Sequence, residues 1–140
     1  MAGDDMRRDG VSPETDELAS TLMGDAFDLL ASGEGFEVLL VVQDEAGTVS
    51  SYEFEDDGPE ACLEGARDRV RELAGALRYA IAYEGAVADE DGSYADALLL
   101  EFGERGYRAY SAYSLIGGKG AGDRFTWTDP APAGELEPLL

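Results

Sequence analysis

The chain of 140 residues contains no histidine, a single lysine and a single cysteine. Histidine is the commonest general acid or base in enzymes and the commonest protein ligand of metals, so its absence removes the usual residue of both kinds of site. The one cysteine, Cys62, excludes an intramolecular disulfide and is expected to be a buried structural residue. We therefore expect a cytoplasmic, non-enzymatic protein without a cofactor.

Long hydrophobic runs and excess positive charge are also missing. The longest apolar run, residues 38–42 (VLLVV), is far shorter than the roughly 20 residues of a membrane-spanning helix, and the N-terminus lacks the apolar segment of an export signal. The 31 acidic residues outnumber the 10 basic ones, giving a formal net charge of −21. Such a field opposes binding to phosphate backbones and anionic lipids, so we expect neither nucleic acid nor a membrane as partner. Adaptation to high salt and recognition of a basic partner stay open as explanations of the acidity.

Two segments predict amphipathic helices. Ser12 suits the N-cap of the first, Pro13 suits its first turn, and apolar residues recur at helical spacing as far as Gly33. The second helix is expected to begin at Pro59, with an apolar stripe formed by Cys62, Ala66, Val70, Leu73 and Leu77.

The remaining apolar segments predict strands joined by hairpin loops. In residues 36–56, a three-residue loop that ends in Gly47 pairs Asp44 with Thr48. Three further strands are expected near residues 79–88, 94–102 and 107–116, with a short edge strand within 123–129.

Together these elements predict an α+β fold of order α-β-β-α-β-β-β, with the short edge strand as an eighth element. The sheet is expected to be mainly antiparallel, with five to six strands. We expect a mobile tail at 1–11, one domain at 12–128 and a C-terminal tail at 129–140 without a regular core element.

The order of elements over residues 12–116 is similar to that of profilin-like and roadblock-type scaffolds, in which helices pack on a five-stranded antiparallel sheet of order 2-1-5-4-3. The resemblance is topological and carries no motif, so it implies a fold and no activity. Within residues 79–106, the segments YAIAYEG and DALLLEFGERG also look like small, uncharacterised bacterial α+β families. That likeness implies no chemistry.

Three polar residues are the candidates for chemistry. The expected hairpin register makes Glu84 and Asp96 diagonal neighbours on one side of the sheet, within reach of a shared proton or metal ion. Lys119 lies in the segment GGKGAG (residues 117–122), whose glycine amides can bind an anion. In a phosphate-binding loop the residue after the lysine is Ser or Thr, whereas here it is glycine. No nucleophile or oxyanion device accompanies them, so we predict no catalytic residue, no cofactor-binding residue and no metal site.

The last three strands have apolar residues on both sides. The residues on one of these sides form a candidate interface, which consists of Tyr94, Leu98, Leu100, Phe102 and Tyr110. Two helices that lie together cover one face of a sheet, so the other face needs its own cover. The C-terminal segment, a second copy of the chain in a homodimer, or a partner protein would each provide it.

These patterns favour a non-enzymatic protein-interaction domain that binds itself or a protein partner. One alternative is an acidic inhibitor, of the immunity-protein or nucleic-acid-mimic kind, that occupies a basic partner. Another is a small carboxylate-based enzyme or metal binder that uses Glu84 and Asp96.

The acidic composition predicts that salt stabilises the fold. Raising KCl from about 0.1 M to about 1 M shortens the Debye length from about 10 Å to about 3 Å, so repulsion among the carboxylates weakens. We expect the Tm, measured by circular dichroism, to rise over this range. A flat or falling Tm would contradict an unrelieved acidic surface.

Overall fold

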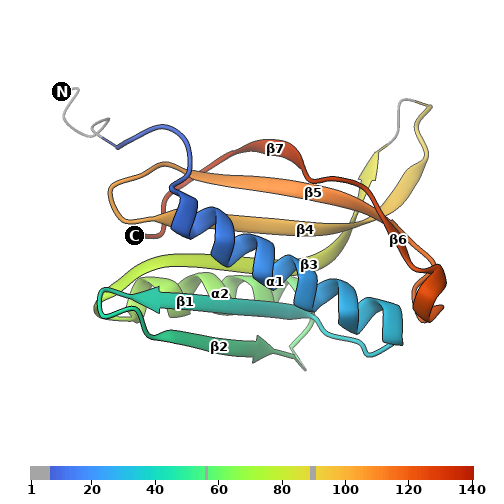
Figure 1. The fold of residues 1–140 in the computed structure, drawn as a ribbon, viewed down its shortest axis with the longest axis horizontal. Coiled ribbons are helices and arrows are strands. Elements are labelled where there is room, and N and C mark those ends of the chain that lie inside the picture. The colour runs from blue at the N-terminus through green and yellow to red at the C-terminus, as the bar shows by residue number, and fades with distance from the viewer. Residues whose placement is uncertain (1–6, 56, 89–90) are drawn as a thin grey trace.

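Two helices enclose a curled antiparallel sheet, and the elements follow the predicted α+β order (Figure 1). The structure is a computed structural model that describes residues 7–55, 57–88 and 91–140. The strand order is β2-β1-β3-β4-β5-β6, and β7 also pairs with β5. The elements are α1 (Pro13–Ser32), β1 (Val38–Asp44), β2 (Val49–Phe54), α2 (Pro59–Glu72), β3 (Ala76–Ala88), β4 (Tyr94–Glu104), β5 (Ala109–Gly117), the 3-10 turn η2 (Gly122–Arg124), β6 (Thr126–Trp127) and β7 (Ala131–Leu136).

The first helix begins and ends where the sequence predicts. The hydroxyl oxygen of Ser12 accepts a hydrogen bond from the Thr15 amide at 3.2 Å, and Pro13 occupies the first turn, where its missing N–H is not needed. Gly33, with a φ of 83°, takes the left-handed conformation that ends the helix. Local signals therefore determine both ends of α1.

Both predicted hairpin registers are confirmed. In the β1–β2 loop, Gly47 has a φ of 89°, and the Asp44 amide donates to the Thr48 carbonyl oxygen at 3.0 Å. Between β3 and β4, Glu84 lies opposite Leu98. The confirmed register determines which face of the sheet each side chain of these strands points to.

The second helix is shorter than predicted. It begins at Pro59 but ends at Glu72, so the expected helical stripe was wrong at Leu77. Leu73 is already extended, with φ −79° and ψ 108°, and Gly75 then turns the chain with a φ of 79°. Leu77 belongs to β3, because this left-handed glycine lets the chain pass directly from α2 into the central strand.

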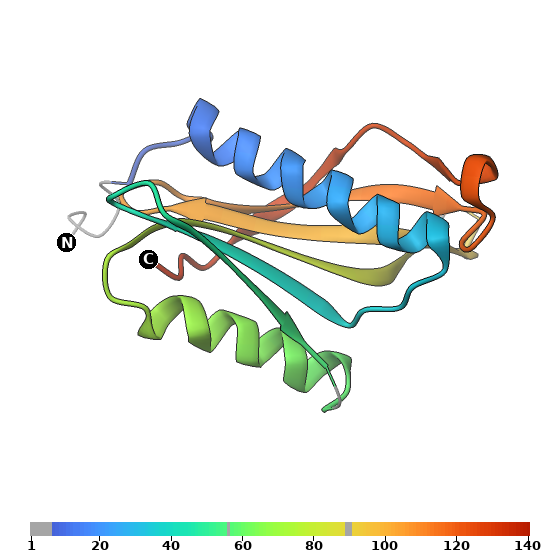
Figure 2. The same cartoon turned by 60° about the horizontal axis from the view of Figure 1, so that its bottom comes forward.

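The helices lie on opposite faces of the sheet, and the expectation of two helices on one face was wrong (Figure 2). The cause is β3, whose residues alternate between the two cores. Ala80 and Ala82 face the α1-side core, whereas Tyr79 and Ile81 face the α2-side core. The α1-side core also contains Leu22, Ala26, Leu30, Leu98 and Leu100, and the α2-side core contains Val38, Leu40, Val42, Cys62, Ala66 and Val70.

Residues 129–140 are not a tail without structure, so that prediction was wrong. Residues 131–136 form β7, which pairs with β5. Phe125 is buried in the α1-side core, and Leu139 and Leu140 pack against the α2-side core. The C-terminal segment, one of the three covers that the sequence suggested, therefore contributes apolar residues to both faces.

The predicted N-terminal tail is held in place where it is described. Residues 1–6 lie outside the described residues. The Arg8 amide donates to the Gly106 carbonyl oxygen, and the Arg8 carbonyl accepts from the Arg108 amide, both at 2.9 Å. This part of the expected tail is therefore attached to the turn between β4 and β5.

The strand order differs from that of the profilin-like and roadblock-type scaffolds. Their order, 2-1-5-4-3, places the last strand of the chain beside the first. Here β3 lies beside β1, with Leu40 opposite Ile81. The turn at Gly75 returns the chain from α2 directly to this position, so the resemblance ends at the order of elements along the chain.

Close packing of α1 on β3 predicts that this contact tolerates no extra volume. Ala82 is 0% exposed, so Ala82→Leu should lower the free energy of unfolding by about 1–3 kcal/mol. Ala86→Leu is the matched control, because Ala86 lies on the same face of β3 and is exposed; we expect a change within about 0.5 kcal/mol. Urea unfolding measures both variants. Equal losses would contradict the close contact at Ala82.

Candidate functional site

The three predicted polar residues come together beside the C-terminal end of α1. Lys119 Nζ lies 2.7 Å from Glu84 Oε2. The hydrogen bond to Glu84 and the charge of that carboxylate raise the pKa of Lys119, and the charge of Asp96 adds to the effect. The Gly120 amide donates to the Leu30 carbonyl oxygen at 2.8 Å, which holds the glycine loop against the helix.

This group has the geometry of a structural ion pair. The Lys119 ammonium is already paired, and the loop leads into η2 and β6 rather than into a helix whose N-terminus would bind phosphate. A hollow of about 230 Å³ adjoins it, lined by residues that include Leu30, Glu34 and Glu84. In the described ranges, no group of three or more His, Cys, Asp or Glu side chains is placed to hold a metal ion.

The five predicted interface residues do not form one patch. Leu98 and Leu100 are 0% and 3% exposed, because α1 covers them, so they belong to the core and not to the surface. Tyr94 is 76% exposed at the start of β4. Phe102 and Tyr110 lie side by side on β4 and β5, with ring centroids 6.5 Å apart. Of the five, this last pair lies in a larger apolar surface.

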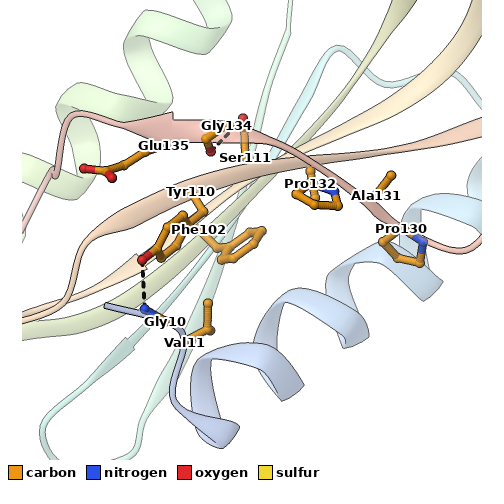
Figure 3. Close-up of a pocket in the computed structure, with 11 residues that line it drawn as sticks. Gly10, Val11, Phe102, Tyr110, Ser111, Pro130, Ala131, Pro132, Gly134 and Glu135 are labelled. Atoms are coloured by element: carbon orange, nitrogen blue, oxygen red, sulfur yellow. Dashed lines mark hydrogen bonds between the residues drawn. The ribbon is translucent and has the colours of Figure 1, made fainter. Parts of the chain in front are cut away.

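That surface is a groove between the start of α1 and β7, over β4 and β5 (Figure 3). Its volume is about 540 Å³. Val11, Phe102 and Tyr110 point toward one another on one side of it, whereas Glu135 points away. The rest of the lining includes Ala112, Pro130 and Pro132.

Local chain geometry keeps the groove open. The pairing of β5 with β7 shifts register between Ser111 and Ala112, and a shift of this kind bends the strand. Pro130 and Pro132 have no N–H, which is tolerated at the edge of a sheet. The segment of residues 130–136 therefore follows the edge of the sheet, where β7 pairs with β5, and leaves a space between itself and the start of α1.

Polar groups at the rim of the groove are paired with one another. The Tyr110 hydroxyl accepts a hydrogen bond from the Gly10 amide at 2.8 Å. Arg108 forms ion pairs with Glu135 at 3.0 Å and with Asp9 at 2.7 Å. The groove therefore presents mainly apolar atoms to a ligand.

On the α2 side, an ion pair between a partly exposed arginine of the helix and a buried carboxylate of the sheet links the two. Glu101 is 3% exposed, and its carboxylate accepts hydrogen bonds from Arg67 Nε at 3.0 Å and Arg67 Nη2 at 2.5 Å. The Tyr83 hydroxyl donates to the same carboxylate at 2.7 Å. Burial, together with this hydrogen bond, raises the pKa of Tyr83 well above its ordinary value. The group is fully hydrogen-bonded, which fits a structural role.

A second polar network fixes the start of α1 to β4. The carboxylate of Glu104 accepts hydrogen bonds from the hydroxyls of Ser12 and, at 2.7 Å, Thr15. Burial opposes ionisation of Glu104, but these hydrogen bonds and the charge of Arg78 outweigh it and lower the pKa of this carboxyl. Arg78 Nε has no hydrogen-bond partner among the described residues and lies 3.6 Å from Glu104 Oε1.

Cys62 is buried on the α2 side, 3% exposed. Its thiol donates to Glu37 Oε2 at 3.0 Å. This hydrogen bond and burial raise the pKa of the Cys62 thiol, which disfavours the reactive thiolate. The geometry is that of a structural cysteine.

The sequence interpretation missed the walls of the groove, because it assigned both to tails. Val11 was placed in the N-terminal tail, and residues 130–136 (PAPAGEL) in the C-terminal one. A usable signal was present, since prolines followed by glycine and an apolar residue are compatible with an edge strand. The aromatic cluster of Phe27, Phe125 and Trp127 was also missed as a group, because its members are far apart in the sequence.

Comparison of the chain with models of protein families, with curated proteins and with solved structures finds no match. Neither helix of the described residues has the length and apolar character needed to cross a membrane. The features of the molecule that bear on function are therefore the groove, the charges and the aromatic cluster.

The Arg67–Glu101 pair predicts an asymmetric mutational response. Arg67→Met leaves a buried carboxylate without its cation, so we expect a loss of about 3 kcal/mol in unfolding free energy. Arg67→Met combined with Glu101→Gln should recover much of that loss. Arg71→Met, which removes an exposed pair with Asp68, is the control and should cost less than about 1 kcal/mol. A double variant no more stable than Arg67→Met would contradict the burial argument, as measured by urea unfolding.

Proposed function

We propose that this protein is a non-enzymatic interaction domain that binds an apolar segment of a basic protein partner. The observation that supports this most directly is the apolar groove beside Val11, Phe102 and Tyr110. Open apolar surfaces on folded domains commonly mark binding sites.

The groove suits a protein segment better than a small molecule. Small-molecule sites combine apolar walls with a few polar groups that fix the orientation of the ligand. Here the hydroxyl of Tyr110 and the carboxylate of Glu135 are already paired with Gly10 and Arg108. An apolar side chain from a partner could fill the space without needing such groups.

Charge selects the kind of partner. The outer face of α1 carries five exposed carboxylates and the helix contains no basic residue; they belong to Glu14, Asp16, Glu17, Asp25 and Asp28. With a net charge of −21, a second copy of the chain is repelled, whereas a basic protein is attracted. The groove begins at the N-terminal end of this helix, so apolar and electrostatic recognition adjoin each other.

The same acidic surface favours a narrower version of this proposal, in which the domain inhibits a basic nuclease or DNA-binding protein by covering its binding face. We place this activity in the cytoplasm, because the buried Cys62 thiol is unpaired and fits a reducing compartment. The carboxylates Glu84 and Asp96 give no comparable support for an enzyme, since Lys119 is paired with Glu84.

Selection of displayed random peptides on the full-length chain tests the proposal. We expect the enriched peptides to combine apolar residues with flanking lysine or arginine. Val11→Arg should weaken their binding about tenfold, as measured by calorimetry. Val49→Arg is the matched control, because Val49 is also exposed (51%, against 39% for Val11) but lies on β2, away from the groove.

Three results would overturn the proposal. Enriched peptides that lack either apolar or basic residues would contradict the chemistry of the site. An equal loss of peptide binding in Val49→Arg would show that the groove is not the binding surface. A concentration-dependent dimer in sedimentation velocity that Val11→Arg abolishes would show that a second copy occupies the groove.

A further inference from the structure

The turn η2 and the strand β6 lie near the C-terminal half of α1 (Figure 1), and an aromatic cluster joins this part of the chain to the helix. Phe27 stacks with Trp127 at 5.2 Å between ring centroids and an interplanar angle of 27°. Phe125 lies 5.7 Å from Phe27 and 6.0 Å from Trp127. The two phenylalanines are 7% exposed, whereas Trp127 is 56% exposed. The phenylalanines therefore close the core, and much of the indole faces solvent.

A pocket of about 580 Å³ opens at this indole. One wall is α1, where the small residues Gly24 and Ala31 leave room and Asp28 supplies a carboxylate. The other wall is η2, where Asp123 supplies a second carboxylate. No lysine or arginine is among the described residues that line the pocket, and neither carboxylate has a hydrogen-bond or ion-pair partner within the described chain.

We propose that this pocket binds an organic cation, the ammonium or guanidinium group of a small molecule or of a basic side chain. The face of tryptophan is the most favourable aromatic surface for a cation within about 6 Å of the ring. Asp28 on α1 and Asp123 on η2 also line the pocket and supply two negative charges to it. The site therefore combines the two features that recognise a weakly hydrated cation.

Other ligand classes fit less well. An apolar ligand would desolvate Asp28 and Asp123 without giving them a partner. A hard metal ion needs about six or more oxygen ligands, and the described residues place no group of three carboxylates together. An organic cation uses both the ring face and the carboxylates.

This inference is independent of the groove. The two sites lie toward opposite ends of α1 and share no lining residue. A negative peptide selection would contradict the proposed function of the groove but not the cation pocket. A negative cation titration would contradict the cation pocket but not the groove.

The protein carries its own reporter, because Trp127 is the single tryptophan of the sequence. Choline and N-acetylarginine methylamide are titrated into the full-length chain at low ionic strength while its emission is followed. We expect a saturable change that weakens as KCl is added. The neutral isostere of choline, 3,3-dimethylbutan-1-ol, should give no change at the same concentrations. A response to choline indicates a free ammonium ligand, and a response to the arginine derivative alone indicates a basic side chain.

Matched variants locate the site. Asp28→Asn and Asp123→Asn should each weaken binding about threefold or more, because each removes a charge close to the cation. Asp25→Asn removes the same charge from an exposed position of α1 that does not line the pocket, so binding should stay within twofold of wild type. Binding should broaden the methyl signal of choline in NMR spectra, and Trp127→Leu should abolish this broadening.

Several outcomes would overturn the proposal. They are a neutral isostere that acts like choline, the absence of any saturable response to either cation, and an Asp25→Asn variant that weakens binding as much as Asp28→Asn. A neutral isostere that acts like choline would show that charge plays no part in binding. The absence of a saturable response would show that the pocket is not a cation site. An equal effect of Asp25→Asn would show that binding depends only on the overall negative charge of the protein.

Discussion

Burial of β3 from both sides is the constraint on which the rest of the structure depends. Its small residues, such as Ala80 and Ala82, let α1 lie close to the sheet, while Tyr79 and Ile81 fill the space beneath α2. A strand buried on both faces requires cover on both faces, which the two helices and the C-terminal segment together supply. The apolar groove and the pocket at Trp127 lie where that cover is incomplete, toward the two ends of α1.

Much of the local structure could be predicted from the sequence, because its signals act over a few residues. Ser12 and Gly33 bound α1, and Gly47 sets the β1–β2 register. The side of the sheet on which each helix packs could not be predicted in the same way, because it depends on how small and large residues alternate on β3. Likewise, β7 resembles a tail until β5 is there to pair with it. The candidate polar residues Glu84 and Asp96 were placed correctly as neighbours, but the pairing of Glu84 with Lys119 arises from a loop more than thirty residues away along the chain.

Several of the few cations of this acidic chain form ion pairs between different elements. Arg67 joins α2 to β4, Arg105 joins the β4–β5 turn to Glu45 in the β1–β2 loop, and Arg108 joins the start of β5 to β7. Lys119 joins the glycine loop to β3 in the same way. Because these four cations are bound at contacts between other elements, they do not neutralise the exposed carboxylates of α1, the helix that adjoins both candidate binding sites.

The two edges of the sheet differ in their capacity to pair further. On one edge, β7 is interrupted by Pro132 and by a register shift, and the neighbouring β6 spans two residues. On the other edge, β2 is a regular six-residue strand without proline. Pairing between chains through β2 alone joins one edge to its own copy, and such an arrangement is complete at two subunits. Edge-to-edge pairing is therefore less favourable at β7 than at β2, and this difference disfavours growth of the sheet into a filament.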